Sequence, residues 1–298
     1  EIPLRLVGSE MCIRDRGITS AEEQPVLPKG NNLSLHLLEL FTSQVAKVGM
    51  TDGIRQVLQE ESDALRAYYE QAGILIARPA GGTSCRLAIS AKGGTNAENH
   101  NHNDVGSYAV ALGSETMVGD QGGPNSYPGD YFNGDAPQKY KIKGSFGHPV
   151  PVVDGRTQSS GGKAKGVVLQ KEFTNEKDVF SIDYTSAYST PNLDKLIRTF
   201  VYDRQGEGNF TVGDEFTAKT PIRFETAITT RADWKILDDT HLLLATDSEQ
   251  MIVAIEASGK VAFTSETIEV NSPAYTRIGI ALKNQSKEGY IRLKMYTK

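Results

Sequence analysis

The sequence predicts a mainly β protein, an antiparallel β-sandwich that follows a short N-terminal α-helical segment. Apolar residues repeat at helical spacing before residue 72, and from Gly73 onward they recur with a period of two. Turn signals in this second part return about every ten residues, which is typical of a sandwich. With 38% hydrophobic and 23% charged residues, a chain of 298 residues has enough apolar side chains for a core.

The first residues do not read as natural protein sequence. Residues 7–15 (VGSEMCIRD) match an in-frame translation of a transposon sequencing adapter, and the chain begins at Glu1 instead of Met. We therefore expect residues 1–16 to be an adapter artefact joined to a truncated gene, and we exclude them from the prediction of the fold. An ordinary N-terminal strand is the alternative. An artefact here would also have removed any signal peptide and any upstream domain.

Two segments before residue 72 have the apolar stripe of an amphipathic helix. In residues 32–48 the apolar side chains are spaced three and four apart, and residues 51–71 repeat this pattern with Gly73 just beyond the end. Two helices cannot cover both of their apolar faces alone, so they need a further layer of structure. We therefore expect residues 17–72 to be a helical remnant of something larger.

From Gly73 to the C-terminus the pattern is that of short strands separated by turns. Gly81-Gly82 and Gly113-Ser114 each stand between two apolar runs, as hairpin turns do. We expect residues 73–298 to form one antiparallel sandwich domain. The predicted strands cover residues 74–78, 86–90, 107–112, 116–120, 166–173, 178–185, 196–203, 209–216, 222–229, 250–257, 274–282 and 290–296.

Charge, hydropathy and cysteine content exclude several classes of protein. Lys and Arg number 32 against 37 Asp and Glu, a net charge of −5, so the chain has no basic footprint for nucleic acid. No apolar run approaches the roughly 18 residues that a membrane span needs. Two cysteines, Cys12 and Cys85, cannot form a disulfide scaffold.

Two histidines separated by one residue, a carboxylate and a third histidine form a candidate metal site. His100 and His102 project from the same face of an extended chain, so both could bind one metal, or one could bind while the other transfers protons. Asp120 at a predicted strand end and His148 further on complete a set of N and O donors that suits Zn²⁺ or a similar divalent ion. A solvated, Asn-rich loop is the alternative.

The expected strand pairing sets a condition for this site. With a two-residue turn at Gly113-Ser114, simple register places Asp120 opposite Ser107 and not opposite His102. The loop that carries His102 would therefore have to fold back toward the sheet.

Six short motifs follow one another in order along the chain. They are YEQAGILIAR at 69–78, HNHNDVGSY at 100–108, GDQG at 119–122, the segment 148–155, DYT at 183–185 and RTFVYD at 198–203. This combination resembles the heparinase II/III-like polysaccharide lyases over about residues 65–298. In that family an α/α toroid packs on a C-terminal antiparallel sandwich, and the cleft between them cleaves uronic-acid polysaccharides by β-elimination. The resemblance implies that the helical segment is a remnant of the toroid.

The resemblance also implies a role for five residues. His100 matches a catalytic histidine that contacts the substrate in the cleft, and Asn99 matches a substrate-binding position. His102, Asp120 and His148 match the ligands of a zinc that is mainly structural and braces the loop presenting the cleft histidine. The tyrosine that acts as acid or base belongs to the toroid, upstream of this chain, so we expect the chain to be inactive alone.

Three functions compete at this stage. The first is the C-terminal part of a zinc-containing polysaccharide lyase with an acidic polysaccharide substrate, periplasmic or secreted by the resemblance. The second is a non-catalytic, metal-braced sandwich that binds carbohydrate. A cupin-like metal enzyme is third. The HxH of His100 and His102 also opens the cupin motif, but residues 106–108 (GSY) stand where cupins place a Glu ligand. Tyr127, Tyr131 and Tyr140 could contact sugar near the cleft, with structural packing as the alternative.

Overall fold

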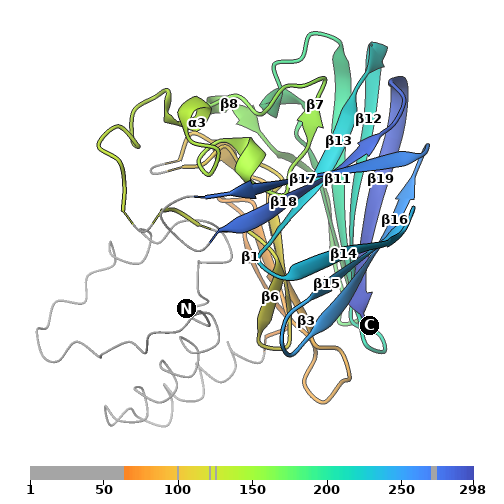
Figure 1. Cartoon of the computed structure of the whole chain (residues 1–298). Coiled ribbons are helices and arrows are strands. Elements are labelled where there is room, and N and C mark those ends of the chain that lie inside the picture. The colour runs from red at the N-terminus through yellow and green to blue at the C-terminus, as the bar shows by residue number, and fades with distance from the viewer. Residues whose placement is uncertain (1–63, 99–100, 121, 125, 270–273) are drawn as a thin grey trace, which may run out of the picture.

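The computed structural model describes residues 64–98, 101–120, 122–124, 126–269 and 274–298. Over these ranges the chain is built almost entirely of antiparallel strands, so the predicted mainly β fold is confirmed (Figure 1). The predicted helix at 32–48 and residues 51–63 of the second predicted helix lie outside the described residues. No helix in the described ranges is long and apolar enough to cross a membrane.

The described end of the second predicted helix is a strand, so the prediction is wrong there. Arg66–Tyr69 forms β1 and pairs with β2, Ile74–Ala77, through a short turn. Gly73 adopts a φ of 62° in this turn, and its N–H donates to the carbonyl of Glu70 at 3.3 Å. The glycine thus supplies a left-handed turn residue and does not end a helix. Strand structure accordingly begins before residue 73.

The strands form three larger sheets and one small one. The first sheet has the order β1-β2-β3-β5-β6, with β3 Leu87–Lys92, β5 Tyr108–Leu112 and β6 Glu115–Val118. The second has the order β14-β15-β16-β19-β12-β11-β10-β9, with β14 Asp233–Asp238, β15 His241–Ala245, β16 Gln250–Ala257, β19 Ser286–Thr297, β12 Asn209–Ile222, β11 Leu193–Asp203, β10 Lys177–Asp183 and β9 Val167–Phe173. The third has the order β17-β18-β13-β7, with β17 Val261–Ile268, β18 Tyr275–Leu282, β13 Phe224–Thr230 and β7 Val152–Val153. The small sheet pairs β4, Thr95–Asn96, with β8, Gly161–Lys165, and the short helices are α3 Ala136–Lys139, η2 Ser145–Gly147 and η3 Thr185–Ala187.

The first and third sheets adjoin and form one layer of the sandwich. The N–H of Gly119, just after β6, donates to the carbonyl of Thr229 in β13 at 3.0 Å, and the Thr229 hydroxyl donates to the carbonyl of Gly119 at 2.6 Å. The eight-stranded sheet is the opposite layer, in which β11, β12 and β19 run side by side (Figure 1). The chain therefore passes from one sheet to the next directly before Asp120.

The core lies between these layers and follows the period of two. The even-numbered residues of β11 from Leu196 to Tyr202 are buried, whereas the odd-numbered residues between them are half-exposed. The Phe200 ring stacks against Phe210 of β12 with an interplanar angle of 2°, and Tyr108 of β5 packs on both from the other layer. Aromatic pairs of this kind stabilise the contact beyond simple burial of apolar area.

Most predicted strands are present, and several others were not predicted. Besides β1, β4, β7 and β8, the unpredicted strands are β14, β15 and β17, which all lie between residues 233 and 268. Almost every residue of β14 is exposed, and in β17 only Ile268 is buried. Because neither strand has a strongly buried face, its sequence lacks the apolar alternation on which strand prediction depends.

Candidate metal centre

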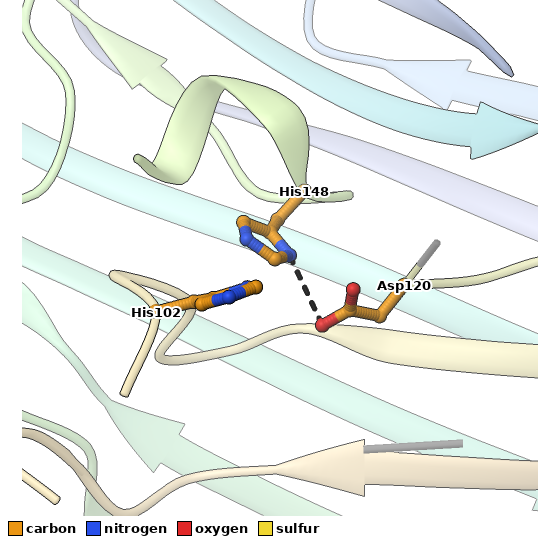
Figure 2. A group of neighbouring side chains, drawn as sticks. All are labelled: His102, Asp120 and His148. Atoms are coloured by element: carbon orange, nitrogen blue, oxygen red, sulfur yellow. Dashed lines mark ion pairs between the residues drawn. The ribbon is translucent and has the colours of Figure 1, made fainter. Parts of the chain in front are cut away.

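The structure brings together three residues that lie far apart in the sequence. His102 is in the loop between β4 and β5, Asp120 follows β6, and His148 follows η2. Each offers one ligand atom to a group in which these atoms all lie within 4.8 Å of one another. Figure 2 shows the two imidazoles and the carboxylate converging from the three segments. These are the three residues that the sequence proposed as metal ligands.

The loop with His102 folds back toward Asp120 and His148, as a shared metal site requires. The N–H of Asn103 donates to the carbonyl of Lys143 at 2.9 Å. The Gln158 side chain acts like a backbone partner for Val105, because its Oε1 accepts from the Val105 N–H at 3.1 Å and its Nε2 donates to the Val105 carbonyl at 2.7 Å. These contacts leave His102 only 6% exposed.

The position of Asp120 differs from the simple register in one respect. A β-bulge in the β5–β6 ladder shifts the pairing by one residue, and β6 ends two residues before Asp120. The expectation that Asp120 would lie opposite Ser107 is therefore wrong. Instead, the pairing of Gly119 with Thr229 directs Asp120 away from β5 and toward the histidines.

A close approach of backbone segments fixes His148. A Cβ on the preceding Gly147 would lie 2.3 Å from the carbonyl oxygen of Lys141, so no side chain fits at that position. Nε2 of His148 is 3.0 Å from the carbonyl oxygen of Ile142, and the residue is completely buried. Its other ring nitrogen, Nδ1, lies 3.1 Å from Oδ2 of Asp120.

The hydrogen bonds leave one free ligand atom on each of the three residues. Nε2 of His102 is engaged by the Tyr131 hydroxyl at 3.2 Å, and Nε2 of His148 by a backbone carbonyl. Nδ1 of His148 and Oδ2 of Asp120 are buried and lie 3.1 Å from each other, and Nδ1 of His102 is buried with no hydrogen-bond partner. Buried polar atoms are seldom left unpaired, so Nδ1 of His102 beside this ion pair indicates that the three residues can accept a further ligand.

The electrostatics of the group favour the ligating protonation states. Burial and the neighbouring His148 lower the pKa of His102 to about 4, so its imidazole is neutral near pH 7. Burial also disfavours the charged form of His148, but Asp120 outweighs it and raises the pKa of His148. The two histidines in turn outweigh the burial of Asp120 and lower its pKa, so the carboxylate is ionised. A divalent cation would take the place of the proton that His148 holds against Asp120.

The donor set fits a zinc-like ion. Two imidazoles and one carboxylate are ligand types that Zn²⁺ accepts, and the two second nitrogens are oriented by Tyr131 and a carbonyl, as is common around metal-bound histidines. Ligand atoms of a tetrahedral zinc are about 3.4 Å apart, so a group that extends to 4.8 Å must contract on binding.

Tyr131 is the residue of this site that the sequence did not assign to it. Its side chain is 2% exposed and contacts His102, so it orients a proposed ligand and does not face solvent, whereas Tyr127 is 42% exposed. Spacing gave no signal for this contact, because Tyr131 lies 29 residues after His102 in a segment without regular strands or helices. Asn99 and His100 lie outside the described residues, and their roles stay predictions.

Comparison with known proteins identifies the fold. No family model matches the sequence, and no curated protein matches it. Among solved structures, a heparinase III matches with a TM-score of 0.62 and 17% identity over 78% of this chain and 36% of its own. Heparan sulfate lyase HepC from Pedobacter heparinus matches with a TM-score of 0.66 and 13% identity, over 88% of this chain and 42% of its own. Another heparinase III matches with a TM-score of 0.66 and 12% identity, over 89% of this chain and 42% of its own.

These likenesses define the class of fold. The chain has a heparinase-like polysaccharide lyase fold across most of its length. It spans about two fifths of each of these lyases.

Proposed function

We propose that this chain is the β-sandwich part of a polysaccharide lyase that cleaves a uronic-acid polysaccharide by β-elimination. The observation that carries the proposal is the fold shared with heparinase III structures over most of this chain. The buried group of His102, Asp120 and His148 supports it, because the sequence resemblance assigned zinc ligands to these same three residues.

β-Elimination sets clear demands on the protein. A base removes the proton from C5, the C4–C5 double bond forms, and the bond from C4 to the leaving oxygen breaks while an acid protonates that oxygen. The neighbouring carboxylate must be neutralised first, because its charge opposes the anion that develops next to it. We assign His100 to the substrate side of this reaction, with Asn99 as a donor to the uronate. The acid or base tyrosine is expected on a preceding α/α toroid.

The metal group gives the sandwich its part in this chemistry. When bound, the ion supplies a fixed positive charge that holds the two imidazoles and the carboxylate together. His102 is two residues after His100. An ion that holds the His102 side chain would therefore restrict the position of His100. The buried contacts of Asn103 and Val105 restrain the other side of the same loop.

A non-catalytic carbohydrate-binding sandwich is the second candidate. It is favoured by one observation, the coverage of only about two fifths of each lyase chain. The two candidates differ in whether the protein forms an unsaturated uronate.

The experiment follows that product in the ultraviolet with heparan sulfate, alginate and other uronate polymers. It compares this chain with a protein extended upstream along the same reading frame. We expect turnover only from the extended protein, abolished by His100→Ala and retained by His241→Ala, a histidine on the eight-stranded sheet. Turnover by the short chain would place the acid and base within it. Polymer binding without turnover by the extended protein would favour the second candidate.

A further inference from the structure

A fully buried arginine contacts the backbone of the two loops that carry His102 and His148. Arg198 of β11 is completely buried, and all five of its N–H groups donate hydrogen bonds. Nε and Nη2 donate to the two carboxylate oxygens of Asp214 at 2.7 and 2.6 Å, and Nη2 also donates to the Thr226 hydroxyl at 3.1 Å. Nη1 donates to the carbonyls of Gly106 and Pro149, both at 2.7 Å. The guanidinium therefore has no donor left for any other partner.

The two carbonyls belong to the two loops that carry the histidines. Gly106 is four residues after His102 in the same loop, and Pro149 directly follows His148. One nitrogen of Arg198 thus joins both loops at a single point. These loops are separated by about forty residues of sequence, including β5, β6 and α3.

The carboxylate of Asp214 holds the guanidinium in one orientation. The strands β11 and β12 are neighbours in the sheet (Figure 1), and Arg198 and Asp214 are direct cross-strand partners in them. The Tyr184 hydroxyl donates to Oδ1 of Asp214 at 2.6 Å, and the Thr226 hydroxyl donates to Oδ2 at 2.7 Å. The rings of Tyr108 and Tyr184 lie 5.5 and 5.7 Å from the guanidinium carbon. These contacts consequently hold the planar guanidinium of Arg198 in a fixed orientation within the sandwich.

Charge pairing by itself does not explain this arrangement. A buried ion pair can often be replaced by apolar side chains without loss of stability, so the pair with Asp214 is by itself weak evidence that Arg198 serves stability. A lysine could still pair with Asp214, but a single ammonium group has no planar fork to reach the carboxylate and both carbonyls together. The geometry of the fork, and not the charge, is what only arginine provides here.

We propose that Arg198 is a positioning residue that sets the distance between the loops of His102 and His148 and so prearranges the metal group. The inference rests on the proposed metal-braced lyase for its functional meaning. The restraint of the two loops by Arg198 does not depend on a bound metal, so it can be tested in the metal-free chain.

The test uses Arg198→Lys with Arg204→Lys as a matched control. Arg204 is also buried, pairs with Asp178 and donates to the carbonyls of Arg78 and Leu65, which belong to neither loop. Zinc affinity is measured by competition with a chromophoric chelator, and urea unfolding records the general loss of stability. We expect Arg198→Lys to weaken zinc roughly 10–100-fold, as substitutions of groups that orient metal ligands do. Arg204→Lys should stay within about twofold of the parent.

Amide hydrogen exchange in the metal-free chain provides a readout that does not depend on zinc. Exchange in residues 101–107 and 147–150 should be faster in Arg198→Lys and unchanged in Arg204→Lys. Equal zinc loss in both variants, or unchanged exchange in both loops, would overturn the proposal. If the parent chain binds no zinc, the proposed metal function fails and the exchange result still decides the role of Arg198.

Tyr184→Phe covers the case in which Arg198→Lys does not fold. It removes a single hydroxyl from Asp214 and keeps the ring against Arg198. We expect a smaller loss of zinc affinity, of the order of threefold, with faster exchange in the same two loops. Parent-like values for both measurements would count against Arg198 as a positioning residue.

Discussion

The hydroxyl of Tyr131 lies 3.2 Å from Nε2 of His102, and the opposite ring nitrogen of that histidine has no hydrogen-bond partner. Tyr131 is almost completely buried, so this contact is sheltered from water. It fixes the orientation of the imidazole and leaves Nδ1 available to a ligand. A residue outside the proposed ligand set therefore decides which nitrogen of His102 can bind a metal.

We predict that Tyr131→Phe weakens zinc binding by roughly tenfold with little change of fold. The substitution keeps the buried ring and removes the group that orients His102. Competition with a chromophoric chelator at neutral pH measures the change in affinity.

Tyr140→Phe is the control for this prediction. The Tyr140 ring packs against Tyr131, but its hydroxyl donates to Asp130 and not to His102. Its zinc affinity should equal that of the parent. If the two variants bind zinc equally well, the hydroxyl of Tyr131 does not orient His102.

A second prediction concerns the tight packing of the loop that carries His102. Gly106 has a φ of 86°, and a Cβ there would lie 3.2 Å from the Tyr184 ring. Gly206 also has a positive φ, of 59°, but a Cβ there would meet nothing within 4 Å. Alanine at either position has the conformational penalty of roughly 1–2 kcal/mol, and at Gly106 overpacking adds about 1–3 kcal/mol.

Urea unfolding of the metal-free variants separates these effects. We expect a clearly lower free energy of unfolding for Gly106→Ala than for Gly206→Ala. Equal losses would show that the loop can move away from Tyr184 without penalty.

A third prediction separates the two neighbouring histidines in a catalytically active, extended protein. His100→Ala should lose turnover and keep both zinc and melting temperature, because its proposed role is at the substrate. His102→Ala should lose zinc and melting temperature first, and activity as a consequence. Metal analysis, thermal melts and the ultraviolet assay on the same preparations decide between them. Equal zinc loss in both variants would make His100 a second ligand.

Much of the sandwich could be predicted because its strands alternate buried and exposed residues. In β11, for example, the even-numbered residues 196–202 are buried and the odd-numbered residues between them are half-exposed. The metal group could be proposed because its three side chains form an N and O donor set that suits Zn²⁺ and match the zinc ligands that the resemblance implies. Its assembly depended on the loop of His102 folding back toward Asp120 and His148, which a shared site requires and the structure contains.

Other features depend on contacts that a single sequence does not encode locally. β1 was expected to be helical because its apolar residues suit either period, and only pairing with β2 decides. Alternation places Arg198 on the buried face of β11, but its pairing with Asp214 follows from the register with β12. The contact of Tyr131 with His102 depends on the path of an irregular segment, for which no periodicity exists.

The central claim is that His102, Asp120 and His148 hold one divalent ion, and metal analysis of the purified chain tests it most directly. We predict about one equivalent of zinc, lost in His102→Ala and in His148→Ala and retained in His241→Ala, whose imidazole pairs with Asp238 instead. Removal of the metal by a chelator should lower the melting temperature of the parent chain and leave the two zinc-free variants unaffected. Unchanged zinc content in both His102→Ala and His148→Ala would contradict the claim.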